Sequence, residues 1–152
     1  MRTCTEESLG RLIYHTAQDL RKMAEKILYP YDVTVEQMHL LKNMSVDAGI
    51  TQKALGGIVN KTPANLTRIL DRLETKALIL RRPDASDRRV YLVFLTDKGM
   101  ALVKDVHETF QSFSDRMLHG IGDERQQLVR TCLEIMGENI EQMTLELQKD
   151  MQ

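Results

Sequence analysis

The chain has 152 residues, 42% of them hydrophobic, and a formal net charge of −1. This length fits one compact domain or a domain with helical extensions. No apolar run approaches the roughly 20 residues of a membrane helix and no signal peptide is recognisable, so we expect a cytoplasmic protein without a membrane partner. The two cysteines, Cys4 and Cys132, lie far apart in the sequence, which agrees with a reducing compartment.

Two helices are expected in the first third of the chain. Apolar residues recur at helical spacing over residues 6–28, and Thr5 is placed to cap this helix. Thr34 and Gln37 have the spacing of a capping box, in which each residue satisfies a backbone amide of the other. This pair predicts a second helix that continues to about Val46.

Residues 51–99 predict a helix-turn-helix followed by a two-stranded wing. After a short helix and a polar turn, Thr62 caps a second helix with Pro63 at its first position, where a missing amide donor costs nothing. Leucines and isoleucines recur at helical spacing on one side of this second helix. Two strands follow, Leu78–Arg82 and Arg89–Leu95, joined by a polar turn.

The charge of the chain is concentrated in the same segment. Residues 51–99 hold ten Lys/Arg and five Asp/Glu, whereas the remainder holds eleven basic and seventeen acidic residues. A basic middle between acidic ends suggests a segment that meets phosphate, so we expect the second helix to enter the major groove of double-stranded DNA. The predicted DNA-binding residues are Lys61, Thr62, Ala64, Asn65, Thr67, Arg68, Arg72, Arg81, Arg82, Arg88 and Arg89.

Two long helices are expected after the wing, at 97–119 and 123–148. A winged helix-turn-helix closes its own core, so the apolar stripes of these helices and of the first helix remain uncovered in one chain. An intramolecular bundle would cover them, but we favour a homodimer in which the terminal helices interlock. The expected fold is mainly α (α+β), with a winged helix-turn-helix lobe at 34–99 and a helical dimerisation region formed by 1–33 and 100–152.

Two stretches of the sequence resemble the MarR (multiple antibiotic resistance regulator) family of winged helix-turn-helix transcription regulators. Asp87–Arg89 and Val93–Gly99 resemble the wing and the start of the helix that follows it. Leu66–Arg68 and Leu70–Glu74 resemble the family's recognition helix. Length and helix order match over nearly the whole chain.

The sequence departs from the family in two places. The family usually has a glycine between the recognition helix and the wing, where this chain has Ala77. A left-handed backbone there costs about 1 kcal/mol more in alanine than in glycine. Gly56 and Gly57 in the first helix of the pair are also unusual. Neither departure removes a side chain that faces DNA.

The resemblance implies a homodimeric, ligand-responsive repressor that places two recognition helices on a pseudo-palindromic operator. Arg89 matches the family's wing arginine, which reaches the minor groove, and Asp87 matches the acid that holds this arginine in place. Asp87 therefore joins the predicted DNA-binding residues. The resemblance also implies a crevice for a small aromatic or phenolic effector where the dimer helices meet the DNA-binding lobe. The residues that could line it are His15, Arg21, Met38, His39 and Phe110.

Other functions have weaker support in the sequence. There is no nucleophile elbow, phosphate-binding glycine loop or hydrolase metal motif, so we expect neither an enzyme nor a cofactor. The four histidines lack metal-ligand spacing, and Cys132 lies on an apolar stripe that favours a core position. Two alternatives remain open: an interaction module that uses the winged helix for protein contacts, and a redox-sensing regulator that uses Cys4.

Overall fold

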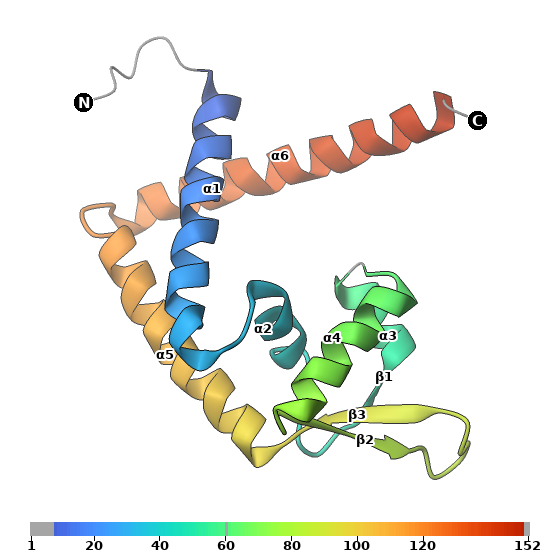
Figure 1. Ribbon diagram of the computed structural model, residues 1–152. Coiled ribbons are helices and arrows are strands. Elements are labelled where there is room, and N and C mark those ends of the chain that lie inside the picture. Colours follow the sequence, from blue (N-terminus) through green and yellow to red (C-terminus); the bar gives the residue numbers. More distant parts are fainter. Residues whose placement is uncertain (1–7, 60, 151–152) are drawn as a thin grey trace. The chain divides into compact units, whose positions relative to one another are not determined.

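The computed structural model describes residues 8–59 and 61–150 (Figure 1), so Cys4 and the cap predicted at Thr5 lie outside the described residues. The chain forms two compact units, one that ends at Phe110 and one that begins at Gln111. This boundary lies downstream of the lobe predicted at 34–99. The elements are α1 (Leu9–Leu28), the 3-10 helix η1 (Tyr29–Tyr31), α2 (Val35–Leu41), β1 (Ile50–Thr51), α3 (Gln52–Val59), α4 (Pro63–Thr75), β2 (Ile79–Pro83), β3 (Tyr91–Leu95), α5 (Asp97–Met117) and α6 (Asp123–Asp150).

The helix caps follow the local sequence. The hydroxyl of Ser8 caps α1 by accepting from the amide of Arg11, and Thr34 with Gln37 forms the predicted capping box of α2. However, α2 ends at Leu41 and not near Val46 as predicted. The side-chain amide of Asn43 donates to the carbonyl of His39 at 2.7 Å, which satisfies one of the carbonyls that a helix end leaves free.

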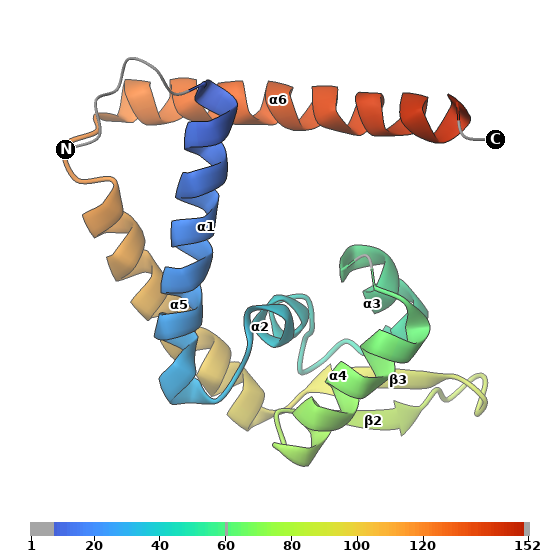
Figure 2. The same cartoon turned by 45° about the horizontal axis from the view of Figure 1, so that its top comes forward.

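The wing is part of a three-stranded antiparallel sheet with the order β1-β3-β2. The hairpin pairs Ile79 with Leu95 and Pro83 with Tyr91, and it projects from the helical part of the unit (Figures 1 and 2). Strand β1 pairs Ile50 with Val93 and was not predicted, because two residues are too short to show an alternating pattern.

The core of the first unit lies where α2, α3 and α4 meet the sheet and the start of α5. The side chains of Val93 and Leu95 alternate with outward-facing residues along β3, as expected for a strand with one buried face. Helix α4 contributes its leucines, as the helical spacing predicted. The buried apolar residues are Leu28, Val33, Met38, Leu40, Leu41, Leu55, Leu66, Leu70, Leu73, Leu78, Ile79, Val93, Leu95 and Val106.

The segment between α4 and β2 packs directly against the start of α5. Ala77 has a φ of 56°, so the chain adopts at this alanine the left-handed backbone for which glycine is usual. The hydroxyl of Thr96 donates to the carbonyl of Ala77 at 2.8 Å, and the amide of Thr96 donates to the carbonyl of Leu78 at 3.1 Å. Gly99, in the first turn of α5, lies so close to this carbonyl that a Cβ would overlap its oxygen.

The second unit contains the end of α5, a turn with Gly120 at a φ of 84°, and the long helix α6. Most of the large apolar side chains of α6 are exposed, and so is Cys132, in contrast to its predicted core position. Within the described residues, no helix combines the length and the apolar character that crossing a membrane requires.

The close approach at Gly99 gives a test of this packing. Gly99→Ala adds a methyl group against the Leu78 carbonyl, so we expect the free energy of unfolding to fall by about 2 kcal/mol, within the range for overpacked sites. Gly57→Ala, inside α3 with no atom within 4 Å of the added Cβ, is the matched control and should gain about 0.5–1 kcal/mol. Urea unfolding of both variants measures the difference. Equal stabilities would contradict the described junction.

Candidate nucleic-acid interface

Helix α4 has one buried and one exposed face. Leu66, Leu70 and Leu73 are buried against the core, and the opposite side carries short or cationic side chains. The hydroxyl of Thr62 caps the helix by accepting from the amide of Asn65, at 3.4 Å. The exposed residues that the sequence placed at the interface are Thr62, Ala64, Asn65, Thr67, Arg68 and Arg72.

Some polar side chains of this face already form hydrogen bonds within the chain, and others do not. The hydroxyl of Thr67 donates to the carbonyl of Pro63 at 2.9 Å, one turn earlier in the helix. Thr62 is occupied as the cap. In contrast, the side chains of Asn65, Arg68 and Arg72 have no hydrogen-bond or ion-pair partner within the described part of the chain. These three side chains offer free donors, and that of Asn65 also a free acceptor, along the exposed face of α4.

The wing turn is organised by two aspartates. The carboxylate of Asp84 accepts from the hydroxyl and the amide of Ser86, both at 2.6 Å, and these bonds hold the pKa of Asp84 below its usual value. Asp87 accepts from Nε of Arg89 at 3.1 Å and from its terminal nitrogen at 3.3 Å. The hydrogen bond from Arg89 lowers the pKa of Asp87 in turn. Both carboxylates are therefore ionised at neutral pH.

The arginines of the wing lie in two different environments. The Arg89 side chain is 91% exposed, and Arg88 beside it is also exposed, so both reach solvent at the tip of the hairpin. Arg82 is exposed as well, with its guanidinium 5.7 Å from the ring centre of Phe94. The side chain of Arg81 is only 17% exposed.

Arg81 faces back toward α4 and not into solvent, where a contact with DNA would need it. Its terminal nitrogen bonds Asp71 at 2.7 Å and Glu74 at 3.2 Å, and its amide also donates to Glu74. Nε and the other terminal nitrogen are buried without a hydrogen-bond partner among the described residues. Arg81 therefore ties β2 to α4, and we assign it to holding the wing against the helix.

Lys61 also has a carboxylate partner. It lies directly before the cap of α4, and its ammonium is 2.6 Å from Oε1 of Glu36 in the first turn of α2. Both residues border a hollow of about 280 Å³ along α4, which is lined by Glu36, Lys61, Asn65, Arg68, Ile69 and Arg72. Glu36 was not among the predicted residues, because no local pattern shows which helix a distant glutamate faces.

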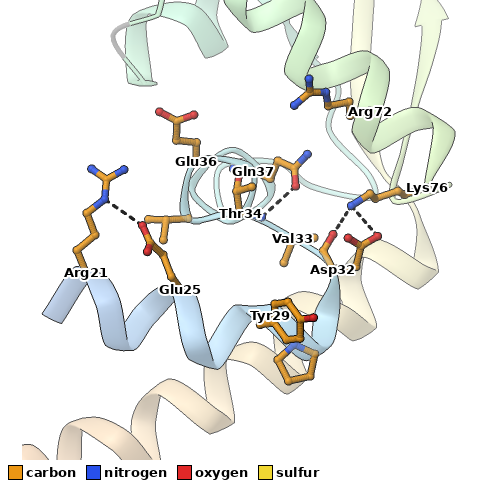
Figure 3. A pocket seen from close by; sticks show the side chains of 12 residues that line it. Arg21, Glu25, Tyr29, Asp32, Val33, Thr34, Glu36, Gln37, Arg72 and Lys76 are labelled. Atoms are coloured by element: carbon orange, nitrogen blue, oxygen red, sulfur yellow. Dashed lines mark hydrogen bonds and ion pairs between the residues drawn. The ribbon is translucent and has the colours of Figure 1, made fainter. Parts of the chain in front are cut away.

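A larger cavity, of about 960 Å³, lies between α1, α2 and α4 (Figure 3). Figure 3 shows Arg21 and Glu25 projecting from α1, Arg72 from α4, and Lys76 from the residue that follows α4. Lys76 donates to the carbonyl of Asp32 and lies 2.9 Å from its carboxylate. The remaining lining residues are Tyr29, Pro30, Val33, Thr34, Val35, Glu36 and Gln37.

The five predicted effector residues lie in different surroundings in the single chain. Only Arg21 lines the cavity described above. Met38 is buried in the core, and His39 is exposed. Phe110 packs on the core with the Lys42 ammonium 5.5 Å from its ring centre, and His15 is half-buried beside Tyr14.

Among residues 8–59 and 61–150, no group of three or more His, Cys, Asp or Glu side chains is placed to hold a metal ion. Cys132 is a free thiol on the exposed surface of α6.

Comparisons with known proteins agree with this geometry. A sequence model of the MarR family matches residues 33–91. The chain is 36% identical over 100 residues to the multiple antibiotic resistance protein MarR of Salmonella typhimurium, covering 66% of this chain and 69% of that protein.

Two crystal structures of DNA complexes have a similar backbone. One is a cysteine-to-serine mutant of Escherichia coli MarR with operator DNA, with a TM-score of 0.73 and 29% identity over 84% of this chain and 92% of that one. The other is the Staphylococcus aureus MepR–DNA complex, with a TM-score of 0.75 and 24% identity over 90% of this chain and 99% of that one.

The likeness covers the parts of the chain that form the exposed basic surface. The family match includes α2, α3, α4, β2 and the wing turn, which carry Asn65, Arg68 and Arg89, and it ends where β3 begins. The Escherichia coli MarR mutant, at 29% identity, has a similar backbone in its complex with operator DNA. The chain belongs to the MarR family, and it is a DNA-binding transcription regulator and not an enzyme.

Proposed function

We propose that this regulator is a ligand-responsive homodimeric repressor in which α4 enters the major groove and the wing reaches the adjacent minor groove. The observation that carries the DNA contact is the row of free side chains Asn65, Arg68 and Arg72 on α4, with Arg88 and Arg89 exposed at the wing. Free amide and guanidinium groups are those that read base edges and bind phosphate.

The two elements supply different parts of recognition. Asn65 and Arg68 have the chemistry for paired hydrogen bonds to adenine and guanine edges, which discriminate sequences by about 1–3 kcal/mol per good contact. Arg89 at the tip of a narrow hairpin suits the minor groove, where width and negative potential are read more than base identity. Asp87 holds the Arg89 guanidinium in a fixed direction before DNA arrives.

The protein-contact alternative has less support from the same surface. The exposed face of α4 carries polar, cationic or small side chains, whereas a protein interface usually has an apolar centre.

The exposed side of α6 supports the homodimer. Apolar side chains recur along α6 at alternating three- and four-residue steps, which is the spacing of a helix seam that packs on another helix. They are Val129, Leu133, Met136, Ile140, Met143 and Leu147. All but the half-buried Met136 are exposed in the single chain. A two-fold dimer bound across an operator excludes other proteins from that duplex, which is the physical basis for proposing repression.

The cavity between α1, α2 and α4 is the site that we propose for an effector, and Arg21 of the five predicted residues lines it. Its lining holds three cations and three carboxylates, and two of the cations are paired, Arg21 with Glu25 and Lys76 with Asp32. Arg72 has no such partner among the described residues and could bind the carboxylate of a small aromatic acid, whose ring would meet Tyr29 and Val33. Arg72 lines this cavity and the hollow along α4. A bound acid would release DNA only if it favours a protein conformation that fits the grooves less well.

The DNA contact is tested by comparing Arg89→Ala with Arg68→Ala. The probes are a duplex that the purified protein selects from a random-sequence pool, and the unselected pool of equal length. We expect Arg89→Ala to weaken binding to both and to flatten the salt dependence by a slope of about 1. Arg68→Ala should cost more on the selected duplex, by about 1–3 kcal/mol.

Lys104→Ala, an exposed cation on α5, controls for the loss of one positive charge. If Arg89→Ala binds both probes like wild type at two salt concentrations, the wing is only a solvated hairpin.

The dimer is tested by placing charges on the seam of α6. Leu133→Glu combined with Ile140→Glu puts two carboxylates where the partner helix would pack, so we expect dissociation at micromolar concentration. Gln127→Glu combined with Gln142→Glu adds the same charge on another side of the helix and should leave the assembly unchanged. Sedimentation velocity distinguishes the two pairs. A stable dimer of the seam variant would exclude this face as the interface.

The effector site is tested with Arg21→Gln. We expect salicylate-like acids to shift the midpoint of DNA binding by wild type, and this shift to shrink in Arg21→Gln, because the variant loses a cation of the cavity wall. Lys22→Gln removes the neighbouring cation, which does not line the cavity, and should respond like wild type. An equal shift in both variants, or no shift in wild type, would remove this cavity from consideration.

A further inference from the structure

The Lys61–Glu36 ion pair joins two elements on the surface that we propose for DNA. Lys61 is held at the entrance to α4, since its amide donates to the Gly56 carbonyl at the end of α3. Its ammonium extends 2.6 Å from Oε1 of Glu36, which α2 presents from the opposite side of the hollow. The side chains are 34% and 52% exposed, so the pair lies at the surface.

Glu36 is the only carboxylate among the residues that line this hollow. The other lining residues include three cations, Lys61, Arg68 and Arg72. The hydrogen bond from Lys61 and its charge lower the pKa of Glu36, and the charge of Arg21 adds to this effect. Glu36 is therefore ionised at neutral pH and occupies the position that an anion would take beside these cations.

Such a pair contributes little to folding. Both side chains are partly exposed, so solvent screens their attraction and ordering them costs entropy. The N-terminal end of a recognition helix is, however, where proteins commonly contact the phosphates that fix their register on the duplex. Lys61 stands at this end of α4, one residue before the cap.

We propose that Glu36 sets the affinity of this regulator for DNA by holding the Lys61 ammonium in the place of a backbone phosphate. This inference rests on the proposed DNA contact of α4. When Lys61 moves to a phosphate, the Glu36 carboxylate loses its partner and takes up a cation from solution. The cation that Glu36 takes up offsets the cation that the phosphate releases, so the net number of released cations does not change. This contact therefore adds little to the salt dependence of binding.

The proposal is tested with Glu36→Gln in the full-length protein. The amide keeps the size of the side chain and loses its charge, so Lys61 is free to neutralise one phosphate. We expect tighter binding than wild type at low salt, on the selected duplex and on the random pool by the same factor. This advantage should shrink about 3.5-fold between roughly 50 and 200 mM salt, as one additional phosphate contact requires.

Two controls separate the effect of the Lys61–Glu36 ion pair from other effects of charge. Glu108→Gln, at an exposed position on α5, makes the same change in net charge and should bind like wild type. In a Lys61→Gln background, the gain from Glu36→Gln should vanish, because there is no ammonium to release. A gain that persists without Lys61, or one confined to the selected duplex, would overturn the proposal.

Failure of this inference is distinguishable from failure of the DNA contact itself. If Arg68→Ala and Arg89→Ala weaken binding while Glu36→Gln matches wild type at every salt concentration, the interface stands and the role of Glu36 is refuted. If none of the three variants differs from wild type, the interface itself is wrong. Thermal unfolding of Glu36→Gln should give a melting temperature close to that of wild type.

Discussion

The geometry of the DNA-binding lobe depends on one close contact between two backbones. The carbonyl of Leu78 accepts from the amide of Thr96, and Gly99 packs against the same carbonyl with no room for a side chain. This contact joins the end of α4, the start of β2, the end of β3 and the start of α5. A side-chain contact can relax by changing rotamer, but two backbones in contact move only together. The direction of the recognition helix is therefore coupled to the wing and to the first turns of α5.

Carboxylates moderate the basic surface that this junction holds in place. Arg81 is bound by Asp71 and Glu74, Lys61 by Glu36, and Arg89 by Asp87. The surplus of cations in residues 51–99 thus overstates the charge that is free to meet phosphate. The cations without a carboxylate partner among the described residues include Arg68, Arg72 and Arg88. Pairing with a carboxylate fixes the direction of a cationic side chain and lowers its non-specific attraction to DNA. The unpaired groups on α4 therefore carry a larger share of the discrimination between DNA sequences.

Features fixed by neighbouring residues could be predicted from the sequence, and features fixed by distant ones could not. The capping box of Thr34 and Gln37, the cap at Thr62 and the hairpin all follow from local rules, and the structure confirms them. The roles of Arg81 and Glu36 depend on which distant element packs against them, and the hydrophobic periodicity of the sequence does not predict that. The same reason explains the missed strand β1, since it depends on how distant segments pack.

The short strand β1 has a consequence for the order in which the lobe folds. Its pairing with β3 closes a loop that contains α3, α4 and β2, so the whole helix-turn-helix lies between two hydrogen-bonded segments. The β2–β3 hairpin is local and forms at low entropic cost, whereas the β1–β3 pairing brings residues 50 and 93 together and comes later. Once closed, the loop makes the recognition helix part of one cooperative unit. We therefore expect the amide hydrogens of this unit to exchange with solvent together, and the helix not to fray from one end.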